Sequence, residues 1–124
     1  MIKRAALTTL SVLAVVALQT GCSDKPVTYQ ADIKPIIDAN CTACHVMGSD
    51  GYEKSGLLLD SYEGLMKGTK FGPVIVPGSS VSSTLFRLVS GLADPSIRMP
   101  HGKKALSDAD ISTLATWIDQ GAKN

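Results

Sequence analysis

The chain has few aromatic residues and an odd number of cysteines. Only 5% of its 124 residues are Phe, Trp or Tyr, so a domain of this length has few large side chains with which to fill a core. Three cysteines cannot all pair, and two of them lie in one short motif, which excludes a framework of several disulfides. A large apolar prosthetic group would help to fill the interior.

The chain also lacks a large excess of either positive or negative charge. The whole chain has a formal net charge of +1. Without a leader that contains Lys3 and Arg4, 10 basic residues would face 11 acidic ones, a formal charge of −1. Such a balance gives no sign of a surface that binds nucleic acid or an anionic membrane.

Residues 1–21 have the pattern of a secretory signal peptide. Lys3 and Arg4 precede an apolar run over residues 5–18, and small residues follow it. The alternative is a membrane-spanning anchor, but the run is shorter than the roughly 20 residues that a spanning helix needs. We therefore expect export and cleavage.

The stretch LQTGC, which ends at Cys22, resembles the lipobox of bacterial lipoproteins. It departs from that pattern at Gln19, where an aliphatic residue is usual. The resemblance implies a lipid on Cys22, a short tether over residues 22–28 and a location on the periplasmic side of a bacterial membrane. The alternative is ordinary cleavage that leaves a free thiol at Cys22.

Residues 29–124 have the periodicity of one all-α domain. Apolar stripes predict four short helices, over residues 33–40, 61–67, 82–90 and 108–120. We expect Asp32 to cap the first helix, a capping box of Asp60 and Glu63 to open the second, and Ser107 to cap the fourth. No segment alternates as a strand should, and the proline-bracketed stretch FGPVIVPG predicts an extended loop.

The stretch CTACH, from Cys41 to His45, is typical of covalent haem attachment. Its two thiols can reach the two vinyl groups of one porphyrin, and the histidine can ligate the iron. A zinc site would need all three motif residues and His101, two of them adjacent in sequence, which strains a tetrahedral geometry. A thioredoxin-like redox pair would need a strand leading into Cys41 and Cys44, whereas a helix is expected here.

An electron carrier with six-coordinate iron needs a second ligand on the far face of the haem. Met47 follows the motif too closely to cross the ring, and a core role suits Met66 better. Met99 and His101 lie two residues apart in the loop SIRMPHG, so one loop can present either of them. The residues alone leave both as candidates.

These pieces together resemble a class I c-type cytochrome, and more closely the small planctomycete-type cytochrome c domain. The resemblance is carried by ADIKPIIDANCTACH, SGLLLDSYEGLMKG, VIVPGSSVSSTLFRLV and RMPHGKKALSDADISTLATWIDQGA, and it covers nearly all of residues 29–124. It implies a compact all-helical fold with one covalent haem c. It further implies thioethers at Cys41 and Cys44, His45 as proximal ligand, Met99 as distal ligand with His101 as the alternative, and Trp117 beside the haem edge.

Two positions depart from the common class I pattern. Ile33 stands where many members have a glycine that lets the last helix approach closely. No proline lies between His45 and Met66, so the usual carbonyl acceptor for the ring N–H of the proximal histidine is not identified, although some group normally takes that role.

The function that follows from this interpretation is the transfer of single electrons between redox partner proteins, not enzymatic catalysis. Basic residues are expected around the haem edge, where they would steer an acidic partner: Lys70, Arg98, Lys103 and Lys104. The alternatives are a haem-based redox or gas sensor, a small haem enzyme such as a peroxidase, and a haem-bearing subunit of a larger oxidoreductase.

Overall fold

The computed structural model describes residues 25–124, and Cys22 lies outside this range. The described part is helical and contains no strand, only an isolated bridge between Thr69 and Gly72. The expected all-α class is confirmed. The elements in chain order are η1 (Tyr29–Ile33), α1 (Lys34–Asn40), η2 (Thr42–Cys44), α2 (Asp50–Ser55), α3 (Tyr62–Lys67), α4 (Thr84–Ser90), η3 (Pro95–Ile97) and α5 (Asp108–Asp119).

The first helical segment begins earlier than the sequence predicted. A π-helical turn, η1, runs directly into α1, and Thr28 rather than Asp32 is its N-cap. The Thr28 hydroxyl accepts from the N–H of Ala31, while the Asp32 carboxylate accepts from the N–H of Thr28 at 2.8 Å. Thr28 therefore caps the start of η1, while Asp32 accepts from the backbone and the hydroxyl of Thr28, and the prediction of Asp32 as N-cap is wrong.

Of the two caps predicted for the later helices, one is wrong and one is confirmed. Ser61, not Asp60, caps α3 by accepting from the N–H of Gly64. Ser107 caps α5 as predicted, since its hydroxyl accepts from the N–H of Asp110 and donates to that residue's carboxylate. Gly91 ends α4 in the left-handed conformation, which glycine adopts without steric cost.

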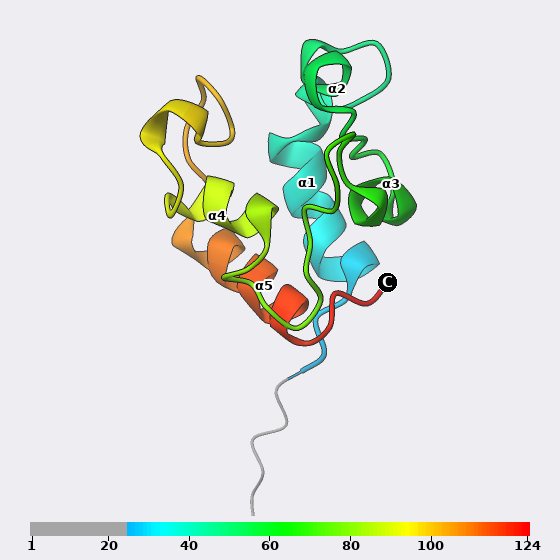
Figure 1. Cartoon of the computed structure of the whole chain (residues 1–124). Helices are drawn as coiled ribbons and strands as arrows, with labels where there is room; N and C mark the ends of the chain where they lie inside the picture. The colour runs from blue at the N-terminus through cyan, green and yellow to red at the C-terminus, as the bar shows by residue number, and fades with distance from the viewer. Residues whose placement is uncertain (1–24) are drawn as a thin grey trace, which may run out of the picture.

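The helices form two groups around a shared core. In Figure 1, α4 and α5 lie on one side and α1, α2 and α3 on the other, with the segment after η3 rising above α4. At the base of the fold, α5 packs against η1. Trp117 is fully buried there beside Tyr29, whose ring also meets Tyr62 edge-on at 5.3 Å between centroids.

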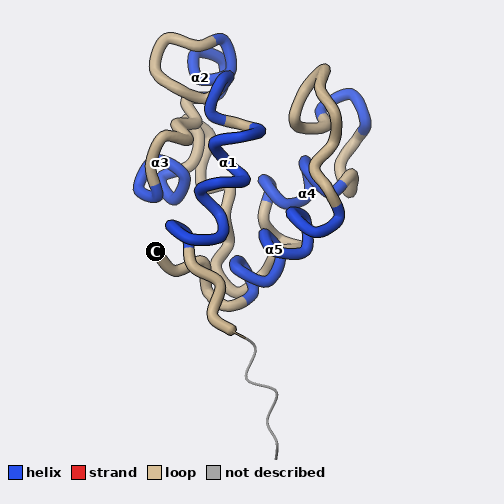
Figure 2. Tube along the Cα trace, turned by 180° about the vertical axis from the view of Figure 1, so that it is seen from behind, coloured by secondary structure: helices blue, strands red, loops and turns tan. Residues whose placement is uncertain are grey.

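Both ends of the described chain are held beside the C-terminal end of α5. The N–H of Val27 donates to the side-chain carbonyl of Gln120 at 2.8 Å, and the Trp117 ring N–H donates to the carbonyl of Lys123. The rear view in Figure 2 shows the chain entering the fold at this end, with α2 at the opposite end. Among residues 25–124, no helix has the length and apolarity needed to cross a membrane.

Candidate functional site

A cavity of about 620 Å³ opens between the two groups of helices. Its size falls within the roughly 300–1,000 Å³ typical of cofactor and ligand sites. One wall consists of the motif residues Cys41, Cys44 and His45 with parts of α2, and the other of α4 and the loop that carries Met99 and His101. Most of the lining surface is apolar. Its apolar side chains include three from α4 and three from other segments: Leu85, Leu88, Val89, Leu57, Leu59 and Val74. The structure therefore brings all the predicted haem-site residues to one cavity.

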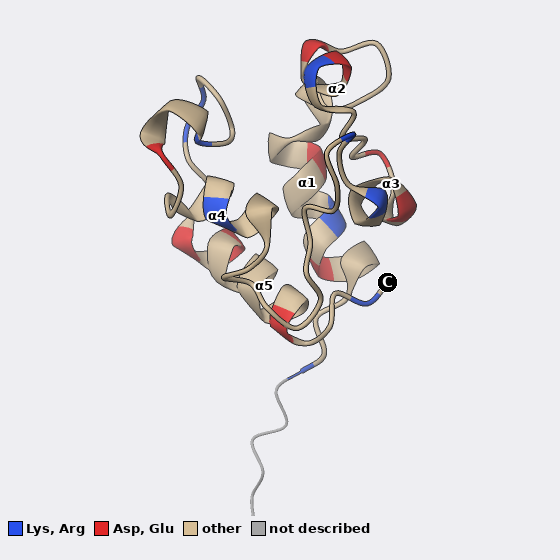
Figure 3. Ribbon diagram, viewed as in Figure 1, with Lys and Arg blue, Asp and Glu red and all other residues tan. Residues whose placement is uncertain are grey.

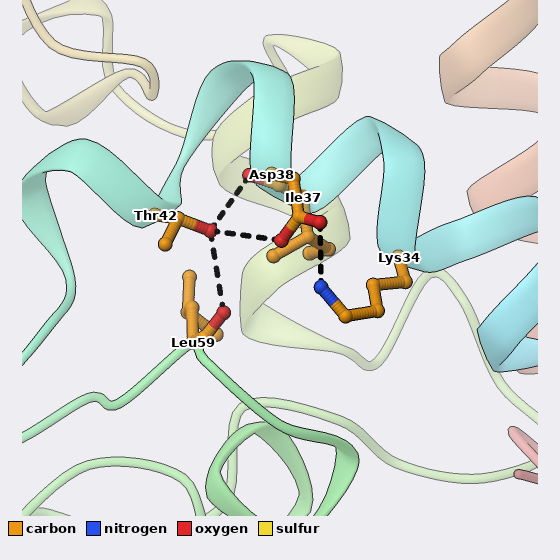
Figure 4. Close-up of polar contacts among 5 residues, drawn as sticks. All are labelled: Lys34, Ile37, Asp38, Thr42 and Leu59. Atoms are coloured by element: carbon orange, nitrogen blue, oxygen red, sulfur yellow. Dashed lines mark hydrogen bonds and ion pairs between the residues drawn. The ribbon is translucent and has the colours of Figure 1, made fainter.

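The motif is positioned by the end of α1. Cys41 is the C-cap of this helix, and its N–H donates to the carbonyl of Ile37 at 2.8 Å. The hydroxyl of Thr42, between the two cysteines, lies 3.3 Å from the Ile37 carbonyl and 3.4 Å from both the Asp38 carboxylate and the Leu59 carbonyl (Figure 4). Thr42 thus links the motif to α1 and to the segment before α3.

The imidazole of His45 is partly buried in the cavity wall. Burial lowers the pKa of His45, and the backbone of Leu57 opposes this shift. The neutral imidazole is the form that ligates a metal ion. Its Nδ1 atom is buried, and no described residue forms a hydrogen bond with it that has acceptable geometry. His45 borders the cavity, so its ring can ligate a group held there.

The two thiols differ in their surroundings. Burial raises the pKa of the Cys41 thiol to about 11, the neighbouring Cys44 adds to the rise, and Lys103 opposes it. Cys44 is exposed, and neither thiol is in a disulfide. A protonated, half-buried thiol and an exposed one therefore stand at the same edge of the cavity, near the ammonium group of Lys103.

Met99 enters the cavity from the opposite wall. Its side chain is partly buried and packs against the core, and its N–H donates to the carbonyl of Leu88 in α4 at 3.1 Å. His101 also lines the cavity but is exposed. The geometry keeps Met99 and His101 both within reach of a group in the cavity, and it buries Met99 more deeply.

The other methionines and Trp117 lie outside the cavity lining. Met47 is 71% exposed, while Met66 packs against the core, as the sequence predicted. Trp117 does not border the cavity, because its ring is enclosed between α5 and Tyr29. Trp117 thus packs between the first and last helical segments, and its position relative to a haem edge stays a prediction.

Helix α2 is the part of the site that the sequence did not predict. It contributes Asp50, Gly51, Lys54 and Ser55 to the lining. Figure 3 shows acidic as well as basic residues on α2, and basic residues on the loop after η3. Both elements border the cavity. Of the four predicted steering residues, Lys103 borders the cavity itself, and the other three are exposed nearby in sequence.

The donor set fits a covalent haem better than zinc. Two thiols and an imidazole share one wall, and a thioether sulfur reaches the cavity from the other. Within residues 25–124, no three His, Cys, Asp or Glu side chains converge as a metal site requires, so the zinc alternative gains no support. The family model described as Planctomycete cytochrome C matches residues 41–102, which is half of the chain. No curated protein and no solved structure matches.

Proposed function

Because the chain belongs to the planctomycete cytochrome c family, we propose that it is an exported monohaem cytochrome, tethered to a membrane through Cys22, that carries single electrons between protein partners. The coarse part of this statement, a haem-binding electron carrier, follows from the family. The observation that supports the rest of the site is the convergence of Cys41, Cys44, His45 and Met99 on one cavity.

Each of these residues has a distinct role in the proposal. Cys41 and Cys44 would hold the haem through thioether bonds, and His45 and Met99 would ligate its iron. When bound there, the haem supplies a one-electron iron couple, and a thioether ligand raises its reduction potential relative to two imidazoles. The apolar side chains of α4 and of the 57–59 segment exclude water, which keeps the change of charge within a rigid, low-dielectric site.

The mouth of the cavity suits an acidic redox partner. Lys54 and Lys103 border it from opposite walls, together with one carboxylate, Asp50. Lys70, Arg98 and Lys104 are exposed and each is adjacent in sequence to a residue of the lining. Lys103 and Cys41 border the same cavity, and Lys103 opposes the rise in the pKa of the Cys41 thiol, which supports a location of this lysine near the proposed attachment site. Positive charge gathered at one opening raises the rate of encounter with a negatively charged surface.

The proposed tether would leave this mouth free. The chain joins the fold at Val27, at the end opposite α2 (Figures 1 and 2), and α2 borders the cavity. Val27 lies five residue steps after Cys22, so the attachment reaches at most about 18 Å. A lipid on Cys22 would therefore hold the base of the domain near the bilayer and present the cavity toward the aqueous side.

The absorption spectrum of the purified holoprotein tests the haem assignment. We expect a c-type spectrum that survives denaturation and acid extraction in the native chain and is lost in a Cys41→Ala/Cys44→Ala variant. Addition of carbon monoxide to the reduced protein separates the carrier from a sensor or peroxidase, which need an open distal position. Rapid and complete binding would contradict the closed, Met99-ligated carrier.

A further inference from the structure

Gly51, in the first turn of α2, lies against the backbone of the haem motif. A Cβ atom at this position would lie 2.2 Å from the carbonyl oxygen of Cys44 and 3.2 Å from Cε1 of the His45 ring. The closest ordinary carbon–oxygen contacts are about 3.3 Å, so a side chain would force α2 and the motif apart by about 1 Å. The backbone of Gly51 does not itself require glycine, since its φ is outside the left-handed region.

Ser49 holds the same carbonyl from another direction. Its hydroxyl lies 2.6 Å from the carbonyl oxygen of Cys44 and 2.7 Å from that of Val46, and it accepts from the N–H of Val46 at 3.2 Å. The Cys44–His45 peptide therefore rests between a hydroxyl and a glycine of the segment that opens α2.

The His45 ring lacks the hydrogen bond that usually fixes such a ring. A ligating histidine normally donates its second N–H to an acceptor that sets the ring orientation. Nδ1 of His45 forms no hydrogen bond of acceptable geometry among the described residues, although the backbone of Leu57 lies near enough to the ring to oppose the lowering of its pKa by burial. The backbone of His45 is fixed by the N–H of Leu59, which donates to its carbonyl at 2.8 Å. Rotation of the ring is therefore limited by what the ring touches.

We propose that Gly51 and Ser49 are positioning residues for His45, and that the contact of α2 with the motif sets the orientation of the imidazole toward the iron. This inference rests on the proposed role of His45 as iron ligand. It gives α2 a function, since a helix with a glycine in its first turn gains little from its own sequence and is held instead by the motif against which it packs.

The test compares Gly51→Ala with Gly64→Ala in the full-length holoprotein. Gly64 is a matched control, because it lies in the first turns of another short helix, has a φ outside the left-handed region, and would place a Cβ 2.6 Å from a backbone carbonyl, that of Leu58. Neither Gly64 nor Leu58 borders the cavity. Both variants should unfold at lower denaturant concentration than the native protein.

Of these two variants, only G51A should alter the spectroscopic signals that depend on the orientation of the axial histidine. We expect the haem-methyl resonances of the oxidised protein to shift in the proton NMR spectrum, and its reduction potential to change, in G51A but not in G64A. Equal spectra in the two variants would overturn the inference. Absence of a c-type spectrum in the native protein would instead overturn the proposed function, so the two failures are distinguishable.

Ser49→Ala provides a second variant that adds no atoms. It removes the hydroxyl beside the Cys44 carbonyl and leaves Gly51 in place. We therefore expect Ser49→Ala to fold and to attach haem even if Gly51→Ala does not. The same haem-methyl resonances should shift in S49A, by less than in G51A where both are obtained. Resonances identical to those of the native protein in S49A would contradict the proposal.

Discussion

The N–H of Met99 donates to the carbonyl of Leu88 at 3.1 Å, and both side chains border the same cavity. This bond joins the loop after η3 to α4 just where the loop reaches the site. The sulfur of Met99 is thereby carried on a backbone that is fixed to a helix. His101, two residues later, is exposed and has no such bond to α4.

Replacement of Met99 by alanine should remove the distal ligand. We expect Met99→Ala to lose the sulfur-to-iron band of the oxidised spectrum and to have a lower reduction potential, because a thioether ligand favours the reduced iron. His101→Ala is the matched control and should keep both properties. Loss of the band in H101A alone, or in neither variant, would show that Met99 is not the ligand.

Reversal of charge at the cavity mouth should slow electron transfer to an anionic oxidant. In Lys103→Glu and Lys54→Glu, stopped-flow oxidation by ferricyanide should be slower by a factor of roughly two to ten at low salt, the lower range of electrostatic steering. The difference should vanish near 1 M salt, where the screening length is about 3 Å.

Lys123→Glu changes the net charge equally but lies at the end of the chain that contacts Val27, away from the cavity. Its oxidation rate should remain close to that of the native protein. A slowing in K123E equal to that in K103E would mean that net charge, and not a local basic mouth, controls the encounter.

The hydroxyl of Tyr62 should contribute to stability at the base of the fold. It donates to the carbonyl of Ala122 at 2.9 Å and so joins α3 to the segment that follows α5. Tyr62→Phe should lower the free energy of unfolding by about 1 kcal/mol, as expected for a partly buried hydrogen bond. The hydroxyl of Tyr52 has no protein partner in the described chain. Tyr52→Phe should therefore change the free energy of unfolding by less than about 0.5 kcal/mol. Equal losses would refute the assigned bond.

Thr42 should affect stability rather than haem attachment. Thr42→Val keeps the volume of the side chain but removes a hydroxyl that reaches α1 and the Leu59 carbonyl (Figure 4). We expect the free energy of unfolding to fall by about 1 kcal/mol. The covalent haem content, measured by mass spectrometry, should be unchanged because both thiols and the imidazole remain. A large fall in haem content would instead show that Thr42 acts during attachment.

The sequence predicted those parts of the fold that have an apolar stripe and a polar cap. Ser107 at the start of α5 is such a case, as its hydroxyl and the Asp110 carboxylate reach one another across a single turn. The choice between Thr28 and Asp32 was not decidable from pattern alone, since both residue types cap helices and only the π turn places Thr28 first.

Helix α2 and the contact partner of Trp117 were not predicted, for a different reason. The six residues of α2, DGYEKS, have no apolar periodicity and include a glycine, so their own pattern does not indicate a helix, and Gly51 lies against the Cys44 backbone, a contact that the pattern does not reveal. The ring of Trp117 lies beside Tyr29. Tyr29 belongs to the turn η1, which the sequence did not predict.

The bond between Val27 and Gln120 holds the N-terminal end of the described domain beside the C-terminal end of α5. Both ends of the described chain lie together at the base, so a fluorescent protein, an affinity tag or an electrode linker added at the C-terminal end should leave both the cavity mouth and the proposed lipid attachment at Cys22 free.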